Sequence, residues 1–555
     1  MKLLPAALVS IASLASSALG CAPSPAVAPP AQAPKEPARL GQVREGTPIE
    51  VDIAASRAEA GKASFAWQNL SPAAFAEARR DHKYILLDGA AEWCHWCHVM
   101  DETTYLDPEV GRILKERFVT IRVDVDEHPD IAERYGAWGW PATIVFSPEA
   151  EELGKYRGYL PPKELLEILQ KVEAAAKGAF GEGPKGPQDI ALGPEALPWI
   201  AGRTILDFDS FYDEKEGGWG KRQKAALGLD AEFEVLRGAR GDAAALSRAT
   251  FSLKKYRALL DPVWGGVYQY SAAPTWDEPH YEKLMPYQTA NLEAFARGFA
   301  ATRDPSLLAD AKSIAGYLNG FLSRADGGFF VSQDADVNAH DRKTAFIDGD
   351  VYYRLDDKGR RALGVPRVDD HVFGYENGLA IAAFATLYEA SRDTGALDRA
   401  KRAAEVMLKE AVASDGAVHR GTMTTHYLAD AASLGRGLAR LAEVSNDARY
   451  REAALSIAKA MKRDLEDEAT GTYWDHTPDK AAAGVFARRA KPFVQNVLAA
   501  RFYASLAKVT GDASWKDRAK RLLAAVATPR AIDERGRMLG DLLLAFNEVD
   551  VIPWR

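Results

Sequence analysis

The feature that most constrains this chain is a pair of cysteines, Cys94 and Cys97, separated by two residues. Such a pair can exchange electrons between a dithiol and a disulfide. Together with His98, the same run spells Cys-x-x-Cys-His, the attachment pattern of c-type haem. A zinc half-site, a structural disulfide, a single reactive thiol and chance are further explanations of this spacing, so the flanking sequence has to distinguish among them.

The segments that flank the cysteines alternate between strand and helix patterns. Short apolar runs predict strands at residues 84–88, 118–124, 142–146 and 155–159. Four helices are expected. The first begins at Pro72, with Ser71 as its N-cap, and the second runs from Cys94 to about Tyr105. The other two cover residues 130–135 and 161–176. This order of elements resembles the thioredoxin fold and extends over residues 63–176.

The position of the cysteine pair within this pattern indicates its chemistry. Cys94 should lie at a helix N-terminus, where unpaired N–H groups favour the thiolate and lower the pKa of the thiol. We therefore expect Cys94 to be the attacking thiol and Cys97 to be the resolving one. A protonated His95 would stabilise the thiolate further and make the pair more oxidising than one flanked by neutral residues.

The thioredoxin resemblance implies roles for four neighbouring residues. Asp88 occupies the place of the buried carboxylate that helps deprotonate the resolving cysteine, unless it only ends its strand in a turn. Pro141 stands where the cis-proline of that fold faces the disulfide. Trp96 and Trp140 would tune the site by shaping access to it, or else they are packing aromatics.

Haem and zinc are both disfavoured by this context. The pair stands where a thioredoxin-like fold needs its own active site, which argues against haem attachment. Zinc held by Cys94, Cys97, His95 and His98 is disfavoured because no second pair of ligands follows at a suitable spacing. The sequence therefore predicts no metal and no cofactor.

A second domain is expected at residues 199–555, after a linker rich in glycine and proline at residues 177–198. Its pattern is helical, and a glycine-containing loop recurs near residues 217, 265, 327, 416 and 471. The longest interval holds an extra segment at about 338–375. Units of one helical hairpin and one loop indicate an irregular internal repeat. Six such hairpins closed in a ring would form an (α/α)6 toroid.

That toroid resembles the fold of six-hairpin glycosidases and sugar epimerases, which makes carbohydrate a candidate ligand. The polar residues expected in loops at the bottom of its funnel are His280, Glu282, Asp334 and Asp336. Paired carboxylates can act as acid and base in glycoside cleavage, and a histidine can move a proton in epimerisation. Trp264, Trp276 and Tyr281 would stack on sugar rings. Alternatively, the polar residues only cap turns or pair with buried bases.

The first residues predict export. In residues 1–21, Lys2 precedes an apolar run that ends at Cys21 and resembles a bacterial lipoprotein signal, in which that cysteine receives the lipid. Cleavage without a lipid stays open, because Ala18 replaces the usual leucine. Residues 22–62 would form a tether rich in proline and alanine. The expected location is the cell envelope facing the periplasm, with membrane contact through the lipid anchor only.

The two domains together resemble the spermatogenesis-associated protein 20 family. The run from Trp93 to Met100 is the strongest mark, and residues 276–283 and 332–336 are further marks. Residues 284–288 depart from the family pattern, which puts inherited chemistry of the second domain in doubt. The resemblance implies an α/β thioredoxin-like domain followed by an all-α (α/α)6 toroid.

Three functions follow from these observations. The favoured one is an exported thiol–disulfide oxidoreductase whose toroid recognises a substrate or a thiol or disulfide protein partner. The alternative is a carbohydrate-active enzyme or sugar-binding protein with an accessory thioredoxin module, and the third is a non-enzymatic scaffold of the envelope. The net charge of −8 argues against a nucleic-acid partner.

Overall fold

The structure is a computed structural model that describes residues 63–136, 139–175, 191–552 and 554. Residues 41–555 group into one compact unit. The expected signal peptide, Cys21 and the tether lie outside the described residues, as does most of the expected linker. Within the described ranges, no helix is both long enough and apolar enough to span a lipid bilayer.

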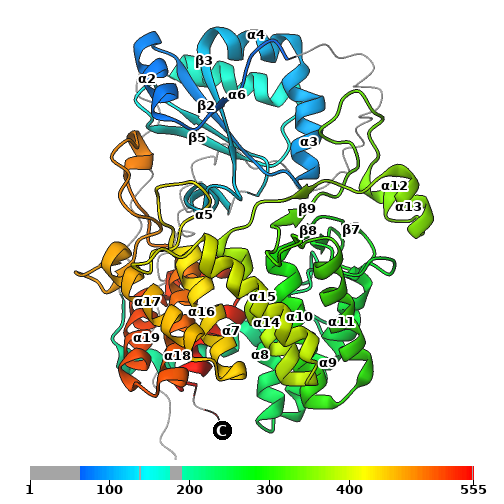
Figure 1. Ribbon diagram of the computed structural model, residues 1–555. Coiled ribbons are helices and arrows are strands. Elements are labelled where there is room, and N and C mark those ends of the chain that lie inside the picture. Colours follow the sequence, from blue (N-terminus) through cyan, green and yellow to red (C-terminus); the bar gives the residue numbers. More distant parts are fainter. Residues whose placement is uncertain (1–62, 137–138, 176–190, 553, 555) are drawn as a thin grey trace, which may run out of the picture. The chain divides into compact units, whose positions relative to one another are not determined.

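A five-stranded sheet organises the first domain (Figure 1). Its strands are β1 (Gln68–Asn69), β2 (Tyr84–Ala90), β3 (Phe118–Asp124), β4 (Ala142–Phe146) and β5 (Glu152–Arg157), in the spatial order β1-β3-β2-β4-β5. β1, β2 and β3 are parallel, whereas β4 and β5 run antiparallel to their neighbours. In the centre, Leu87 of β2 lies opposite both Ile121 and Ile144. The three central strands β2, β3 and β4 are mostly buried because helices cover both faces of the sheet.

The helices of this domain are α2 (Pro72–Asp81), α3 (His95–Glu102), α4 (Pro108–Arg117), α5 (Pro129–Tyr135) and α6 (Pro162–Ala175), with a 3-10 turn at Thr104–Leu106. Phe75 of α2 and Ile131 of α5 pack on one face of the sheet. Met100 of α3 and Leu114 of α4 pack on the other, together with α6. This is the expected thioredoxin-like arrangement of two helical layers around a mixed sheet.

Several element boundaries differ from the expectation. The helix that follows the cysteines ends at Glu102 and not at Tyr105, which belongs to the 3-10 turn. A helix that was not anticipated, α4, then begins after Asp107, whose carboxylate accepts hydrogen bonds from the N–H groups of Glu109 and Val110. The edge strand begins at Glu152, three residues earlier than expected, because a turn at residues 147–151 returns the chain directly beside β4.

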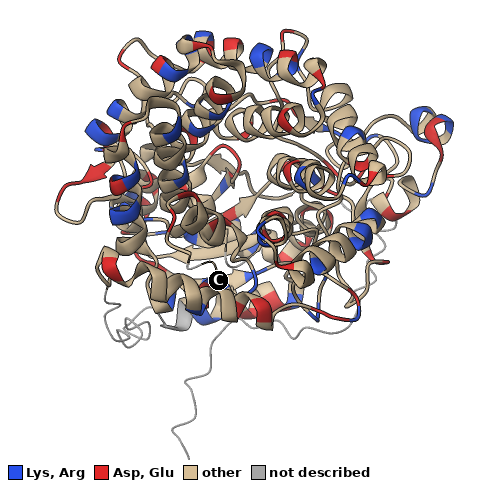
Figure 2. Cartoon of the chain, turned by 90° about the horizontal axis from the view of Figure 1, so that it is seen from below, with Lys and Arg blue, Asp and Glu red and all other residues tan. Residues whose placement is uncertain are grey.

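The second domain is a closed ring of inner helices (Figure 2). Among the described residues the inner helices are α8 (Gly228–Ala239), α10 (Met285–Thr302), α14 (Gly374–Ser391), α16 (Leu428–Ser445), α18 (Phe493–Thr510) and α21 (Gly540–Glu548). Each packs on the next in this order, and α21 packs on α8 to close the ring. The closest approach is between α14 and α16, where a Cβ on Gly378 would meet the backbone of Ser433 at 2.3 Å.

An outer helix pairs with each inner helix. The outer helices are α9 (Ala243–Tyr256), α11 (Pro305–Gly320), α15 (Thr394–Glu410), α17 (Ala448–Leu465), α19 (Ala513–Val526) and α7 (Leu197–Ser210). The first five follow their inner partners directly, whereas α7 pairs with α21 from the far end of the domain. The described residues therefore form six hairpins, and the expected (α/α)6 fold class is confirmed.

The remaining elements are short and lie in the loops. They are β6 (Tyr270–Ser271), β7 (Pro279–His280), β8 (Lys283–Leu284), β9 (Ser332–Gln333), α12 (Gly349–Tyr352), α13 (Asp357–Leu363), β10 (Val368–Asp369), β11 (Glu466–Asp467), β12 (Thr472–Tyr473), α20 (Pro529–Arg535), and 3-10 turns at Pro194–Ala196, Arg257–Leu259 and Gly484–Ala487. β10, β9 and β8 form a small sheet. The extra segment anticipated at about 338–375 thus carries α12, α13 and β10.

Candidate active site

The two cysteines form a disulfide at the N-terminus of α3, directly after β2 and its short exit loop. The S–S distance of Cys94–Cys97 is 2.13 Å. Cys94 is the N-cap of α3, and its sulfur accepts a hydrogen bond from the N–H of Cys97 at 3.2 Å. The Trp140–Pro141 peptide bond is cis and immediately precedes β4, next to β2. The structure therefore places the cysteine pair at the start of a helix, as expected, and Pro141 directly before the strand that neighbours β2.

The disulfide is covered. Cys94 is 3% exposed and Cys97 is 4% exposed. They cluster with Ala90, Ala91, Trp93 and Val125, and with the partly buried Ala132, Trp140 and Leu284. Leu284 belongs to β8 of the helical domain, so this domain supplies part of the wall around the redox site.

Asp336 of the helical domain contacts both histidines of the cysteine motif. Its Oδ2 atom lies 2.7 Å from Nδ1 of His95 and 3.4 Å from Nδ1 of His98, and its side chain is fully buried. Its other carboxylate oxygen accepts the N–H of Gly349 at 2.9 Å. The sequence placed Asp336 and the cysteines in two separate candidate sites, whereas the structure joins them in one.

The charges around this contact favour a protonated His95. Burial by itself would lower the pKa of His95, but the adjacent Asp336 carboxylate outweighs burial and raises the pKa to about 9. Burial also opposes ionisation of Asp336, yet the two histidines hold its pKa well below the usual range. A cationic imidazolium beside the cysteine loop is the arrangement that the sequence predicted would stabilise a thiolate at Cys94.

His280 and Glu282 lie in the same region, 4.0 Å apart. Burial, together with the charge on His95, lowers the pKa of His280 to about 4. Burial raises the pKa of Glu282 to about 7, although the charge on His95 acts in the opposite direction. His280 and Glu282 of the helical domain therefore lie within electrostatic reach of His95 in the cysteine loop.

Asp88 lies buried in β2 and is held by Arg122 of β3. Its Oδ2 atom accepts a hydrogen bond from Nη2 of Arg122 at 2.8 Å, whereas its Oδ1 atom has no hydrogen-bond partner among the described residues. Burial raises the pKa of Asp88, and the positive charge of Arg122 limits the rise. A buried carboxylate with one oxygen that makes no hydrogen bond can accept a proton.

The tryptophans have mostly packing roles. Trp140 packs against Gly89, where an added Cβ would meet its ring at 2.9 Å, so a larger residue at Gly89 would displace it from the disulfide wall. Trp96 is partly exposed and lies against Tyr159. Trp264 stacks on Phe321, and it and Trp276 are each less than 10% exposed. The expectation that these last two stack on sugars is therefore wrong, because core packing occupies their faces.

Several residues that join the two domains were not anticipated. Arg420 of the helical domain donates to the backbone oxygens of Asp126 and Glu127. Arg342 bonds to Glu102 of α3 at 3.0 Å, and the side chain of His340 lies 3.0 Å from the backbone oxygen of Glu92. Arg342 and His340 belong to the extra segment at about 338–375. The length of this segment was the sequence signal that could have pointed to a contact between the domains.

Comparison with known proteins gives the relatives of both domains. Residues 58–178 match the family described as Thioredox_DsbH, "Protein of unknown function, DUF255". Spermatogenesis-associated protein 20 from Homo sapiens is 27% identical over 317 residues, which are 49% of this chain and 39% of that protein. The resemblance to the spermatogenesis-associated protein 20 family is confirmed. The chain spans about two fifths of the length of such relatives.

Other relatives resemble single parts of the chain. Thiol:disulfide interchange protein DsbD 1 from Pseudomonas aeruginosa is 35% identical over 116 residues, covering 19% of this chain and 20% of that protein. Cellobiose 2-epimerase from Bacillus thermoamylovorans B4167 is 12% identical with a TM-score of 0.46, covering 59% of this chain and 85% of that one. The chain thus shares detectable sequence with spermatogenesis-associated protein 20 and, over a shorter stretch, with a disulfide interchange protein.

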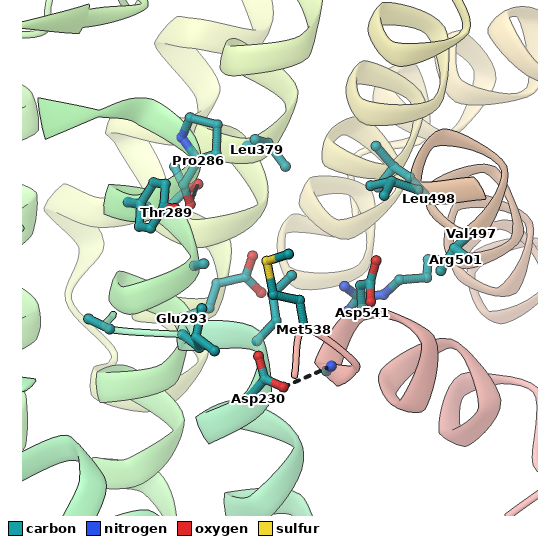
Figure 3. A pocket seen from close by; sticks show the side chains of 18 of the residues that line it. Asp230, Pro286, Thr289, Glu293, Leu379, Val497, Leu498, Arg501, Met538 and Asp541 are labelled. Carbon is teal, nitrogen blue, oxygen red and sulfur yellow. Dashed lines mark hydrogen bonds between the residues drawn. The ribbon is translucent and has the colours of Figure 1, made fainter. Parts of the chain in front are cut away.

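Two cavities are of interest, one beside the cysteine pair and one inside the helical ring. One, of about 490 Å³, reaches Cys97 and His98 and is otherwise mostly polar, with Glu92, Arg122 and His340 among its walls. The other, of about 260 Å³, lies within the helical ring, as Figure 3 shows with its labelled residues from α8, α10, α14, α18 and α21. The first cavity is the one that reaches the cysteine pair, because Cys97 forms part of its wall.

Proposed function

We propose that this protein is a thiol–disulfide oxidoreductase that acts through Cys94 and Cys97. The observation that carries the proposal is the Cys94–Cys97 disulfide at the N-terminus of α3, against which Trp140 packs. The N–H groups at this helix end favour a thiolate at Cys94. The similarity of the first domain to a disulfide interchange protein supports the same chemistry.

The exchange proceeds through a mixed disulfide. The Cys94 thiolate attacks one sulfur of a substrate disulfide, and the first substrate thiolate leaves. Cys97 loses its proton to Asp88 and attacks the sulfur of Cys94, which releases the second substrate thiolate and re-forms the Cys94–Cys97 bond. Two electrons pass to the substrate, and its two thiolates take up the protons. An external dithiol returns the pair to the reduced form, and the same steps in reverse oxidise a substrate dithiol.

The helical domain acts as the substrate-selecting wall in this proposal. Leu284 packs against the cysteine cluster, and Asp336 binds the histidine between the two cysteines. Because the disulfide is almost fully covered, a broad folded surface cannot reach it. A thiol carried by a small molecule or by an extended segment fits the polar cavity beside Cys97 better.

The test is exchange activity of the full-length protein and of two serine variants. We expect wild type to equilibrate with a thiol–disulfide buffer as one two-electron couple and to reduce a small aromatic disulfide. Cys94→Ser should abolish both, whereas Cys21→Ser, which removes the third cysteine, should leave both unchanged. A couple that cannot be reduced, or a Cys94→Ser variant with wild-type exchange, would contradict the proposal.

We further propose that the protein is exported and lipid-anchored through Cys21. The support is the sequence pattern of residues 1–21, followed by the tether at residues 22–62. Expression in a bacterium with a radiolabelled fatty acid tests it. Wild type should carry the label and fractionate with membranes, whereas Cys21→Ser should lose the label; an unlabelled wild type contradicts lipidation.

A second candidate function, sugar binding, is favoured by the cavity inside the helical ring. Asp230 lies in its wall, and burial together with the nearby Asp541 raises the pKa of Asp230 to about 8 (Figure 3). A carboxylic acid with such a pKa can serve as a general acid at neutral pH. Titration calorimetry with hexoses and disaccharides tests this reading. Sugar binding that Asp230→Asn weakens would support this function, and no binding to any sugar of the panel would reject it. A protein that shows neither thiol–disulfide exchange nor sugar binding would be a scaffold.

A further inference from the structure

Two buried ligand atoms point at each other beside the redox loop without a hydrogen bond. Nε2 of His98 and Oδ2 of Asp334 have no hydrogen-bond partner in the part of the chain that the structure describes. The side chains are 5% and 1% exposed, and the two atoms are 3.7 Å apart. Leaving such polar atoms unsatisfied in a protein interior costs free energy, so their convergence needs an explanation.

A third ligand atom completes the group. Nε2 of His340 lies 3.3 Å from the same Oδ2 of Asp334, and its side chain is 29% exposed. The three atoms all lie within 4.8 Å of one another. At bond lengths of about 2.0–2.1 Å, two ligands of a tetrahedral zinc ion lie about 3.3 Å apart. The two distances to Asp334, 3.7 Å and 3.3 Å, are close to this value, and the two histidines, at most 4.8 Å apart, would close by no more than about 1.5 Å around one ion.

The groups behind these atoms orient them. Asp336 accepts from Nδ1 of His98 at 3.4 Å, which leaves Nε2 of the same ring available for an ion. The second oxygen of Asp334 accepts the N–H of Asp336 at 3.0 Å, which fixes the carboxylate that faces the histidines. A carboxylate behind a ligating histidine is the usual outer support of a protein metal site.

The neighbouring contacts define the fourth position. Nε2 of His340 is also 3.0 Å from the backbone oxygen of Glu92 and would exchange that contact for the ion. The Glu92 carboxylate already pairs with Arg367 at 3.0 Å, so it is not needed as a ligand. His98, His340 and Glu92 all border the polar cavity of about 490 Å³, so the remaining coordination position faces that cavity.

We propose that His98, His340 and Asp334 hold a divalent transition-metal ion, with Zn²⁺ as the preferred ion and water at the fourth position. Two imidazoles and one carboxylate suit zinc and its neighbours in the first transition row better than Mg²⁺ or Ca²⁺. The ligands come from α3 and from the loop after β9, so the ion would fasten the redox helix to the helical domain. This site differs from the cysteine-based zinc site that the sequence disfavoured, and it does not depend on the proposed exchange activity.

The competing explanation is an ion pair without metal. Protonated His98 between Asp334 and Asp336 would also compensate these charges, at distances of 3.7 Å and 3.4 Å. His95, Asp336 and Asp348 form a second cluster of this kind. We do not propose a metal there, because Nδ1 of His95 already makes a hydrogen bond to Asp336. The two explanations differ in whether the oxidised protein binds an ion stoichiometrically.

The experiment uses full-length protein with the Cys94–Cys97 disulfide intact, so that no thiolate from the pair competes for metal. The protein is stripped with a chelator and dialysed against Zn²⁺, and the bound metal is measured by mass spectrometry. We expect one ion per chain. His340→Ala should weaken binding on the order of 100-fold, since losing a ligand should cost at least as much as losing an outer support. His371→Ala is the matched control, because His371 also reaches the first domain through Glu127.

Cobalt substitution provides a readout that does not depend on a variant. Co²⁺ in this site should give visible d–d absorption of a low-symmetry nitrogen and oxygen site, without a thiolate charge-transfer band. Absence of stoichiometric binding by wild type would overturn the proposal in favour of the ion pair. Equal binding of the ion by His340→Ala and wild type would also overturn the proposal. The same holds if binding disappears in a Cys94→Ser, Cys97→Ser double variant.

Discussion

At the residue scale, three buried charges illustrate how this protein compensates ionised groups in its interior. Asp261 binds Nζ of Lys283 at 2.7 Å and Nη1 of Arg360 at 2.6 Å, with all three side chains fully buried. Burial opposes the charge on Asp261, but the two cations lower its pKa to about 2. The triad lies beneath β8, so it also supports the strand that places Leu284 against the disulfide.

Asp261→Asn should destabilise the protein by about 3–5 kcal/mol, because two buried cations lose their counterion. The midpoint of urea unfolding at pH 7 measures this loss. Glu278→Gln, an exposed acidic residue of the neighbouring loop, serves as a control that should leave the midpoint unchanged. A variant at Asp261 with wild-type stability would show that the triad contributes nothing.

The same triad predicts a loss of stability in acid. Because the folded pKa of Asp261 is about 2 and lies below its unfolded value, the unfolded chain binds more protons between about pH 4 and pH 2. The contribution of Asp261, about 2 kcal/mol, is therefore present above pH 4 and is lost as the pH falls towards 2. The difference in the free energy of unfolding between wild type and Asp261→Asn should therefore be about 1 kcal/mol smaller at pH 3 than at pH 5; a constant difference would contradict this assignment.

Asp88→Asn should slow resolution of the mixed disulfide by at least about tenfold, because the carboxylate no longer accepts the proton of Cys97. Trapping of the mixed disulfide with an alkylating agent, followed by mass spectrometry, measures its lifetime. Asp101→Asn is the control, since Asp101 pairs with the same Arg122 but is less buried. Equal lifetimes in both variants would remove Asp88 from the mechanism.

At the element scale, the helical domain repeats one turn between inner and outer helices. After α10, α14, α16 and α18, one residue adopts a left-handed conformation, and an aspartate then caps the next helix. The pairs are Arg303-Asp304, Arg392-Asp393, Asn446-Asp447 and Gly511-Asp512. Each aspartate accepts a hydrogen bond from an N–H of the first turn that would otherwise be unpaired. This turn sets the hairpin and is the actual short repeat of the domain.

Gly511→Ala should lower stability by about 1 kcal/mol, because its φ of 72° is unfavourable for any residue with a Cβ. Gly316→Ala, in the middle of α11, should raise stability by about 1 kcal/mol. Neither added Cβ would meet an atom within 4 Å, so only the backbone conformation distinguishes the two sites. Thermal unfolding should shift in opposite directions, and shifts of the same sign would refute this account.

At the scale of the whole molecule, residues of the helical domain complete the thioredoxin-like core. Phe486 is 8% exposed and lies between Phe75 of α2 and Phe146 of β4, with ring centroids 5.6 Å and 5.3 Å away. The N–H of Val485 donates to the backbone oxygen of Ala150 at 3.1 Å. Because apolar burial and backbone hydrogen bonds both cross between the domains, we expect them to unfold together.

Phe486→Ala should cost about 3 kcal/mol and separate the single thermal transition into two, since it leaves a cavity in the shared cluster. Scanning calorimetry of the full-length protein measures this. Phe251→Ala removes a ring that is 36% exposed, so it should preserve a single transition. A single transition in Phe486→Ala would mean that other contacts couple the domains.

The sequence alone was sufficient to predict those structural features that depend only on residues close together in the chain. The strands at residues 118–124 and 142–146 have the predicted bounds, because continuous apolar runs form buried strands wherever they pack. The position of Cys94 at the start of a helix followed from the same local pattern. The helical hairpins were predicted from the helical pattern and from the glycine-containing loop that recurs between them.

Only the tertiary structure decided which distant residues meet. Pairing of α7 with α21 closes the ring between the two ends of a domain, and no local pattern specifies such a pair. Likewise, Asp334 and Asp336 lie more than 230 positions from the cysteine motif in sequence, yet they contact His98 and His95. Packing of the extra segment against α3 determines this meeting. The sequence by itself determined the spacing of the cysteines and their place at the start of a helix, because both are local, whereas long-range packing decided which charges surround that loop.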